Sequence, residues 1–354
     1  MVKPLKELIE GIKPAVINMF RVNMGLKEGE GALVLTDYPH SEFWRNLTPE
    51  ELEDAVARTM LARAVYEVGK EAFPNNRFEF HAYPMTGRNG AEPPPEVADL
   101  MRRFEVVVAI TTYSLSHTRA RKEACRAGAR VASMPGFTAD MFAPGGPMAA
   151  DYGSIKEVSE RIAGWLNGRR DVKVVTDYGT DLRLSVEGRV WDVDVGLYTK
   201  PGEWGNLPAG EVYVAPLEGS AEGVLVIPKG WYPGLTEDMA LHISKGLVTR
   251  IEGGGRVGDH FRELLGLQPP AEGEEYLARR NVAELGIGTN PNARRPDNVL
   301  EAEKIMGTIH VAIGDNSHFG GKVEADLHED FLQPEPTVIV DGEEFMVKGK
   351  ITIL

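Results

Sequence analysis

Apolar positions in the first half of the chain repeat with two different periods. Short apolar or alternating runs predict strands at 32–37, 77–83, 106–110 and 130–134. Before and between those strands, the helical spacing of apolar residues predicts helices at 1–26, 49–71, 95–103 and 118–127. Strands that alternate with helices predict a doubly wound, open parallel sheet, whose ligands bind beyond the carboxyl ends of the strands.

The pattern changes after a predicted helix at about 154–166. Short strands then follow one another between Gly, Pro and Asp turns, at 172–175, 182–186, 190–195, 211–216, 224–227 and 247–252. Two further helices are predicted, at 257–265 and 296–305. We therefore expect an α/β open-sheet domain over residues 1–167 and a mainly antiparallel, β-rich (α+β) domain over 168–354.

Composition and charge narrow the class of protein. The chain has 354 residues, of which 42% are hydrophobic, so a core of ordinary size can form. A net charge of −14 repels a phosphate backbone and argues against a nucleic-acid partner. No apolar run approaches the roughly 18–20 residues of a membrane span, and the segment 1–7 has no apolar core of a secretory signal. The single cysteine, Cys125, is typical of a reducing cytoplasm, where we expect the protein to reside.

Histidines and acids gather near the C-terminus. Three of the 8 histidines fall between residues 309 and 329. His310 lies in an apolar run, where a lone histidine is commonly a hydrogen-bonded core residue. His328 and Asp330 would share one face of a strand, because side chains alternate. Since imidazole and carboxylate hold catalytic divalent metals, these three residues are candidate metal ligands, and the pair His328 and Asp330 could chelate one ion or bridge two.

Two glutamates could complete such a site. Glu211 stands at the entrance of a predicted strand, from which its side chain could point into a cavity or lie on the surface. Glu284 lies in the apolar, Gly-punctuated run 281–291, and burial of its carboxylate is costly unless it is paired or metal-bound. A turn whose acid faces water is the alternative for Glu284. Both alternatives stay open from the residues alone.

Two further histidines are candidates for substrate binding. His117 follows the apolar strand 106–110, where a ligand would meet the carboxyl edge of the sheet. His318 lies in the loop 314–321, between the predicted metal-binding strands. The sequence has no G-x-S-x-G elbow, Walker loop, Rossmann fingerprint or CxxC pair, which disfavours a serine hydrolase, a P-loop enzyme and a zinc ribbon.

At these residues the sequence resembles the aminopeptidase T family of metallo-aminopeptidases (peptidase family M29). The segments 210–216, 283–290, 306–314 and 327–330 look like the metal-ligand segments of that family. The resemblance implies a homodimer that uses a metal-activated water to remove the N-terminal residue of peptides or related small substrates. It also implies two divalent ions (zinc, cobalt or magnesium), held by Glu211, Glu284, His310, His328 and Asp330. Glu284 would bridge the ions or assist proton transfer, with Glu211 beside it.

Other segments resemble a divergent branch that includes 2,5-dihydroxypyridine 5,6-dioxygenase. The family tyrosine that follows the first histidine is missing from 315–319, and 114–118 looks like the divergent branch. That resemblance implies one iron(II) held by His310, His328 and Asp330, and a ring-opening oxidation. The presence of Glu211 and Glu284 favours the two-metal, hydrolytic alternative. A non-catalytic small-molecule binder is the weakest of the three, because five ligand residues would be retained without use.

Overall fold

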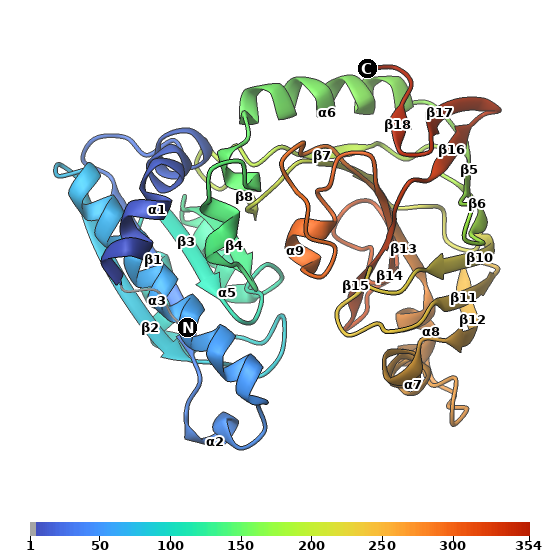
Figure 1. Ribbon diagram of the computed structural model, residues 1–354, viewed down its shortest axis with the longest axis horizontal. Coiled ribbons are helices and arrows are strands. Elements are labelled where there is room, and N and C mark those ends of the chain that lie inside the picture. Colours follow the sequence, from blue (N-terminus) through green and yellow to red (C-terminus); the bar gives the residue numbers. More distant parts are fainter. Residues whose placement is uncertain (1–4) are drawn as a thin grey trace. The chain divides into compact units, whose positions relative to one another are not determined.

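The chain divides into two compact units in the computed structural model, which describes residues 5–354 (Figure 1). The first unit runs to Tyr152 and includes Gly196–Ala209, and the second comprises Gly153–Val195 and Gly210–Leu354. The sequence predicts one boundary, after residue 167, whereas the chain passes between the units after residues 152, 195 and 209. Residues 1–4 of the first predicted helix lie outside the described residues.

The first unit is built on a parallel sheet. Its strands lie in the order β2-β1-β3-β4-β8, and all pair in parallel. Their bounds are β1 Gly31–Tyr38, β2 Arg77–Pro84, β3 Val106–Thr111, β4 Arg130–Pro135 and β8 Trp204–Asn206. Its helices are α1 Leu5–Asn18, α2 Ser41–Trp44, α3 Pro49–Ala72, α4 Pro95–Met101 and α5 Arg119–Arg126, with short π- or 3₁₀-helical turns at Met19–Asn23, Ala139–Phe142 and Pro147–Ala149.

Helices cover the sheet in the way that the doubly wound prediction requires. Helix α3 begins at the predicted capping box, in which Thr48 and Glu51 bond reciprocally, and it packs on β1, β2 and β3 together with α1. Helices α4 and α5 pack with Leu33, Val107 and other inward residues of β1 and β3 in a separate core. The α/β fold with a parallel sheet is therefore confirmed.

The second unit is antiparallel, as predicted. One sheet has the order β12-β11-β10-β6-β5-β16-β17-β18, and a smaller one has the order β15-β14-β13-β9-β7. The bounds in the larger sheet are β5 Asp171–Val175, β6 Asp181–Ser185, β10 Glu222–Ile227, β11 Met239–Ser244, β12 Leu247–Gly253, β16 Thr337–Val340, β17 Glu343–Val347 and β18 Lys350–Ile351. Those in the smaller sheet are β7 Asp192–Asp194, β9 Glu211–Val214, β13 Val282–Gly288, β14 Ile309–Gly314 and β15 His328–Gln333, and the helices are α6 Tyr152–Leu166, α7 Gly255–Leu264, α8 Glu274–Arg280 and α9 Val299–Ala302.

One face of the smaller sheet is buried in the core of the second unit. Val212, Leu285, Val311 and Phe331 alternate with polar or small residues along their strands and join a cluster that includes residues of the larger sheet. Because side chains alternate across a strand, every second residue of β9, β13, β14 and β15 points to the opposite face. That opposite face is therefore available for chemistry.

Two local predictions differ from the structure. The predicted helix at 296–305 is helical only at Val299–Ala302, because Asn298 caps the helix there by accepting from the N–H of Glu301, and Ile305 instead pairs with Asn290. The alternative of a turn for the segment around Glu284 is wrong, because β13 is a buried strand. Strands β8, β11 and β16 to β18 carry no prediction from the sequence.

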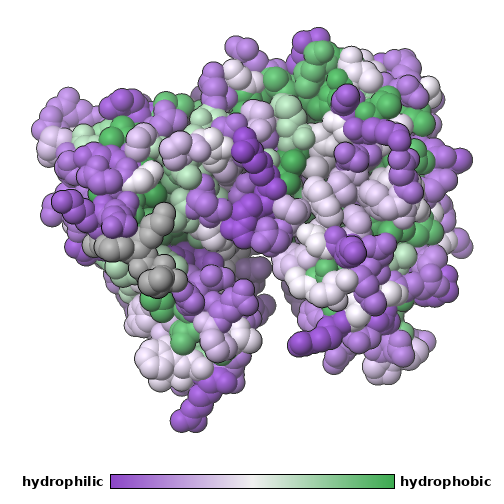
Figure 2. All heavy atoms as spheres, in the orientation of Figure 1, coloured by the Kyte–Doolittle hydropathy of each residue, from purple (hydrophilic) through white to green (hydrophobic). Residues whose placement is uncertain are grey.

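The visible surface is mainly hydrophilic. Figure 2 shows purple residues over most of this face, with hydrophobic residues in smaller groups between them. Among residues 5–354, no helix combines the length and the apolar character needed to cross a bilayer.

Candidate metal centre

The predicted metal ligands meet on one face of the smaller sheet. In the register of the strands, Glu211 lies opposite Gly288, Gly286 lies opposite His310, and Glu284 lies opposite Ala312. Asp330 pairs with Ala312, and His328 with Gly314. The ligands therefore occupy alternate positions on four neighbouring strands, and small residues separate them. The pairing of these strands, together with the alternation of side chains along each, brings together residues that lie up to 119 positions apart (330 − 211 = 119).

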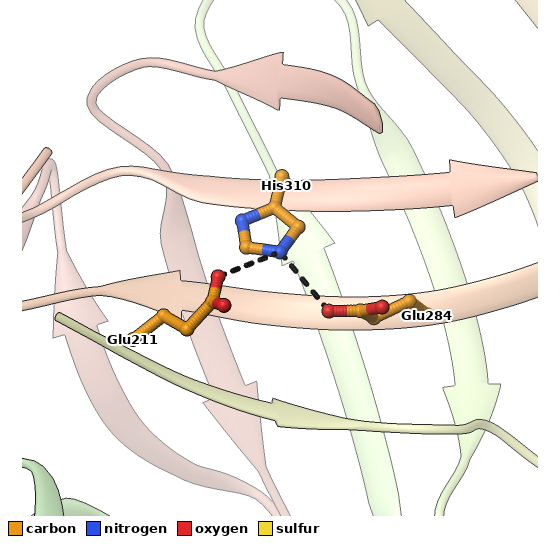
Figure 3. Close-up of side chains that lie close together, drawn as sticks. All are labelled: Glu211, Glu284 and His310. Carbon is orange, nitrogen blue, oxygen red and sulfur yellow. Dashed lines mark hydrogen bonds and ion pairs between the residues drawn. The ribbon is translucent and has the colours of Figure 1, made fainter. Parts of the chain in front are cut away.

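Close-range contacts link these side chains directly. Figure 3 shows the His310 ring above Glu211 and Glu284, with Nε2 directed at both carboxylates. The distances from His310 Nε2 are 3.2 Å to Glu284 Oε1 and 3.6 Å to Glu211 Oε2. The second oxygen of Glu284 lies 3.2 Å from His328 Nε2, so Glu284 contacts both histidines, one with each oxygen. Asp330 Oδ1 is 3.8 Å from His328 Nε2 and 4.0 Å from His310 Nε2.

The side chains form two clusters that share one residue. Ligand atoms of Glu211, Glu284 and His310 lie within 4.8 Å of one another, as do those of Glu284, His328 and Asp330. The buried Oδ1 of Asp330 and Nδ1 of His310 have no hydrogen-bond partner among residues 5–354. A buried carboxylate oxygen without a donor is costly, and a cation would satisfy it. The donor set of imidazole and carboxylate therefore fits a divalent metal.

Hydrogen bonds orient His328 toward the clusters. Its Nδ1 lies 2.8 Å from the carbonyl oxygen of Asp315. Donation to that carbonyl leaves Nε2 as the ring nitrogen that faces Glu284, as in many metal-ligating histidines. The ring of Phe319 stands edge-on to His328, with centroids 5.8 Å apart, and edge-on to Tyr213 at 5.7 Å.

The loop that supplies these contacts is itself anchored. Asn316 is fully buried, donates to Glu218 Oε1 at 3.1 Å and accepts from the N–H of Val323 at 2.9 Å. Glu218 also pairs with Arg189 at 2.7 Å. The loop between β14 and β15 is thus fixed where it meets the candidate metal centre.

A buried lysine lies against the first cluster. The Nζ of Lys304, whose side chain is 1% exposed, is 2.6 Å from Glu211 Oε1 and 2.6 Å from Glu303 Oε1. Burial alone would lower the pKa of Lys304, but the charges of Glu211 and Glu303 outweigh burial and raise that pKa well above its ordinary value. Lys304 is thus a fixed positive charge beside Glu211.

The ionisable groups of the clusters perturb one another. Burial would lower the pKa of both histidines, but the hydrogen bond to Glu284 and the neighbouring acids raise it to about 9 for His310 and to about 10 for His328. Burial would raise the pKa of Glu284, but hydrogen bonds from the two histidines hold it below its usual range. Without a metal, protons on the histidines therefore balance the acids, and a bound cation would replace them.

The two predicted substrate-binding histidines lie outside these clusters. His117 belongs to the first unit, where its exposed ring stands edge-on to Trp204 with centroids 6.2 Å apart. His318 is an exposed loop residue, and its Nδ1 lies 2.9 Å from Ser317 Oγ. The roles of His117 and His318 in substrate binding remain predictions.

Three residues around the clusters carry no prediction from the sequence. They are Glu303, Lys304 and Asn316. A Glu-Lys pair before an apolar strand is typical of a solvated surface, and only the close spacing of residues 303 and 304 to the strand with His310 hints at another role. Asn316 lies two residues after Gly314, and the sequence alone indicates an ordinary loop residue there. The burial of Lys304 and Asn316 depends on contacts with the distant residues Glu211 and Glu218.

Carboxylates and imidazoles on one sheet face of an α/β chain define the candidate metal centre of an enzyme. A family model described as 2,5-dihydroxypyridine 5,6-dioxygenase matches residues 22–353, and the chain belongs to this family. The divergent branch indicated by 114–118 is thus confirmed for the family.

One relative and one solved structure are consistent with this family assignment. A 2,5-dihydroxypyridine 5,6-dioxygenase from Pseudomonas putida KT2440 is 24% identical over 200 residues, which cover 52% of this chain and 55% of that relative. The match thus spans about half the length of the curated relative. The solved structure of 2,5-dihydroxypyridine dioxygenase from the same organism has a TM-score of 0.71 at 17% identity, covering 99% of this chain and 98% of the other.

A second structure ties the fold to the aminopeptidases. Wild-type AmpT from Thermus thermophilus has a TM-score of 0.61 at 16% identity, covering 99% of this chain and all of the other (100%). At such identities these likenesses show the fold alone. The resemblance to the aminopeptidase T family is therefore supported for the fold, and family membership is that of the dioxygenase.

Proposed function

We propose that this protein is a hydrolase of the metallo-aminopeptidase type, which removes the N-terminal residue of short peptides with two divalent ions. The observation that carries the proposal is that Glu284 belongs to both clusters, one with His310 and one with His328. Each cluster therefore offers one imidazole and two carboxylates. A carboxylate with one oxygen toward each histidine can bridge two ions, one beside each histidine.

The residues that would hold the ions follow from the clusters. Glu211, Glu284 and His310 would hold one ion, and Glu284, His328 and Asp330 the other. When bound, such a pair of ions lowers the pKa of a water molecule and polarises a carbonyl group. The zinc, cobalt or magnesium expected from the resemblance are all compatible with imidazole and carboxylate oxygen ligands.

The protein's own groups would prepare this site. Asp315 orients His328 through its carbonyl, and Phe319 and Tyr213 form an aromatic wall beside His328. Such a wall excludes water and favours an apolar side chain on the substrate's first residue. Glu284 is also the carboxylate closest to both histidines, so assisting proton transfer during hydrolysis is its alternative role if it does not bridge the ions.

The second candidate is a ring-opening dioxygenase with a single iron(II). Membership of the 2,5-dihydroxypyridine 5,6-dioxygenase family favours it. It would use His310, His328 and Asp330, and Asp330 Oδ1 lies within 4.0 Å of both histidines. The two histidines, however, belong to different clusters among residues 5–354. The presence of both Glu211 and Glu284 beside these residues, which a single iron(II) of that type would leave unused, makes the dioxygenase the second candidate.

Parallel assays of differently loaded protein distinguish the two functions. Metal-free protein would be reloaded with zinc, cobalt or magnesium and tested for hydrolysis of leucyl peptides and leucyl anilides. Protein loaded anaerobically with iron(II) would be tested for oxygen uptake with 2,5-dihydroxypyridine. We expect hydrolysis that Glu284→Ala abolishes. Oxygen uptake by the iron form without any peptide hydrolysis would reject the aminopeptidase and favour the dioxygenase.

A further inference from the structure

Lys304 is an unusual neighbour for a metal-binding carboxylate. Lysine is almost never fully buried unless it is paired, and Lys304 is 1% exposed. Its ammonium group donates to Glu211 Oε1 at 2.6 Å and lies 2.6 Å from Glu303 Oε1. The positively charged ammonium group of Lys304 therefore lies beside the same Glu211 carboxylate that a divalent ion would bind.

The backbone holds Lys304 firmly in this place. The carbonyl of Lys304 accepts from the N–H of Asn290 at 2.9 Å, and the next residue, Ile305, forms a bridge with Asn290. Asn290 is itself fully buried and follows β13, which carries Glu284. The backbone of Lys304 is therefore fixed, and its ammonium group is held by burial and by the carboxylates of Glu211 and Glu303.

The two oxygens of Glu211 consequently have different partners. Oε1 is engaged by Lys304, whereas Oε2 faces His310 Nε2 at 3.6 Å. In the other cluster, Asp330 Oδ1 has no hydrogen-bond donor among the described residues. The cluster with Glu211 therefore offers fewer free oxygens and lies beside a fixed positive charge.

Resting on the proposed two-metal function, we propose that Lys304 is a positioning residue that makes the two clusters unequal. It restricts Glu211 to one oxygen and repels a cation from the Glu211–Glu284–His310 cluster. The cluster of Glu284, His328 and Asp330 fills first and tightly, and the cluster with Glu211 fills second and weakly. The site therefore passes through a form with one ion, and the concentration of free metal regulates its conversion to the form with two.

We expect repulsion by the Lys304 charge to outweigh the offset by its partner Glu303 and the positioning benefit that Lys304 gives to Glu211. A unit charge near a divalent ion in a buried site interacts strongly, because the surroundings screen it poorly. Holding one glutamate side chain in a single rotamer brings a smaller gain. Removal of the lysine charge should therefore strengthen the second binding step.

Calorimetric titration of metal-free protein with zinc ions tests the proposal without an activity assay. Wild-type protein should bind zinc in two unequal steps. Lys304→Gln keeps a donor for Glu211 but removes the charge, and should strengthen the weaker step by about tenfold or more while the stronger step stays unchanged. Lys304→Arg keeps the charge and should keep two unequal steps. Lys348→Gln, which removes a lysine charge from an exposed pair with Asp177, is the matched control and should change neither step.

Other results would overturn the proposal. An unchanged or weakened second step in Lys304→Gln would mean that the lysine does not repel the second ion. If Lys304→Gln fails to fold by circular dichroism, Lys304→Met, which also removes the charge and leaves Glu303 unchanged, carries the same expectation. If wild-type protein binds zinc in two unequal steps and substitution of Lys304 changes neither step, the proposed role of Lys304 is rejected and the two-metal function is not. Absence of zinc binding to wild-type protein would reject the two-metal function as well.

Discussion

His310 of β14 lies so close to Gly286 of β13 that a Cβ atom on residue 286 would fall 1.9 Å from His310 Nε2. The two residues are cross-strand partners, and the ring lies over the glycine. Residue 286 therefore has to be glycine to leave room for the imidazole. The glycine thus determines where His310 meets Glu284 and Glu211.

Gly286→Ala should displace His310 and weaken metal binding. The added methyl group forces the ring or the strand to move, which costs about 1–3 kcal/mol of folding stability. Zinc affinity should fall by about tenfold or more, because ligands must be held accurately. Calorimetric titration and thermal unfolding measure the two effects. Gly164→Ala in α6 is the matched control, since an added Cβ there meets nothing within 4 Å. Normal zinc affinity in Gly286→Ala would contradict the assigned position of His310.

Asn316→Ala should loosen the loop that orients His328. The substitution leaves Glu218 and the N–H of Val323 without their buried partner, at a cost of about 1–3 kcal/mol. Because the carbonyl of the adjacent Asp315 orients His328, zinc binding should weaken too. Thermal unfolding with and without zinc checks both effects. The idea of an anchored loop fails if Asn316→Ala loses stability but binds zinc as wild-type protein does.

Metal-free protein should lose stability in alkaline solution. The pKa of His310 rises from its ordinary 6.5 to about 9 and that of His328 to about 10, so the folded state holds protons that the unfolded state has released. This contribution is fully present below about pH 6.5 and is lost as pH rises through 9 and 10. Thermal unfolding of metal-free protein from pH 6 to 10 should therefore show a falling Tm. The double change His310→Gln with His328→Gln should flatten the profile, and an equally steep fall in that variant would assign the effect to other groups.

Glutamate substitutions should separate the two clusters. Glu284→Gln removes a charge from both clusters, so both zinc-binding steps should weaken. Glu211→Gln affects only the cluster with His310, so one step should persist with an affinity close to that of wild-type protein. Titration of both variants with zinc measures the difference. Equal effects of the two substitutions would contradict a shared Glu284.

The sequence predicts the parallel sheet well because its signals are local. Apolar runs such as 106–110 and the Thr48 capping box identify strand and helix from neighbouring residues, and both are present as predicted. The helix predicted at 296–305 is longer than the observed α9, Val299–Ala302, for the opposite reason. Its apolar spacing competes with the pairing of Ile305 with Asn290, a contact that depends on tertiary structure.

The sequence indicated the residues that meet in the candidate site, but it did not indicate the residues that surround them. The spacing of His328 and Asp330 is a weak metal motif alone, and it becomes a stronger one together with His310, Glu211 and Glu284. Lys304 could not, because its burial results from pairing with Glu211, 93 positions away. His117 and His318 remain predictions for substrate binding, as does a homodimer, which light scattering in solution would test.

The number of metal ions per chain distinguishes a paired metal site from a single one. Metal-free protein would be reconstituted with zinc, freed of excess metal at a concentration that retains the weaker ion, and analysed by elemental mass spectrometry. Shared use of Glu284 by two clusters predicts about two zinc ions per chain, falling below one in Glu284→Gln. A single bound ion at saturating zinc, unaffected by Glu211→Gln, would contradict the paired site.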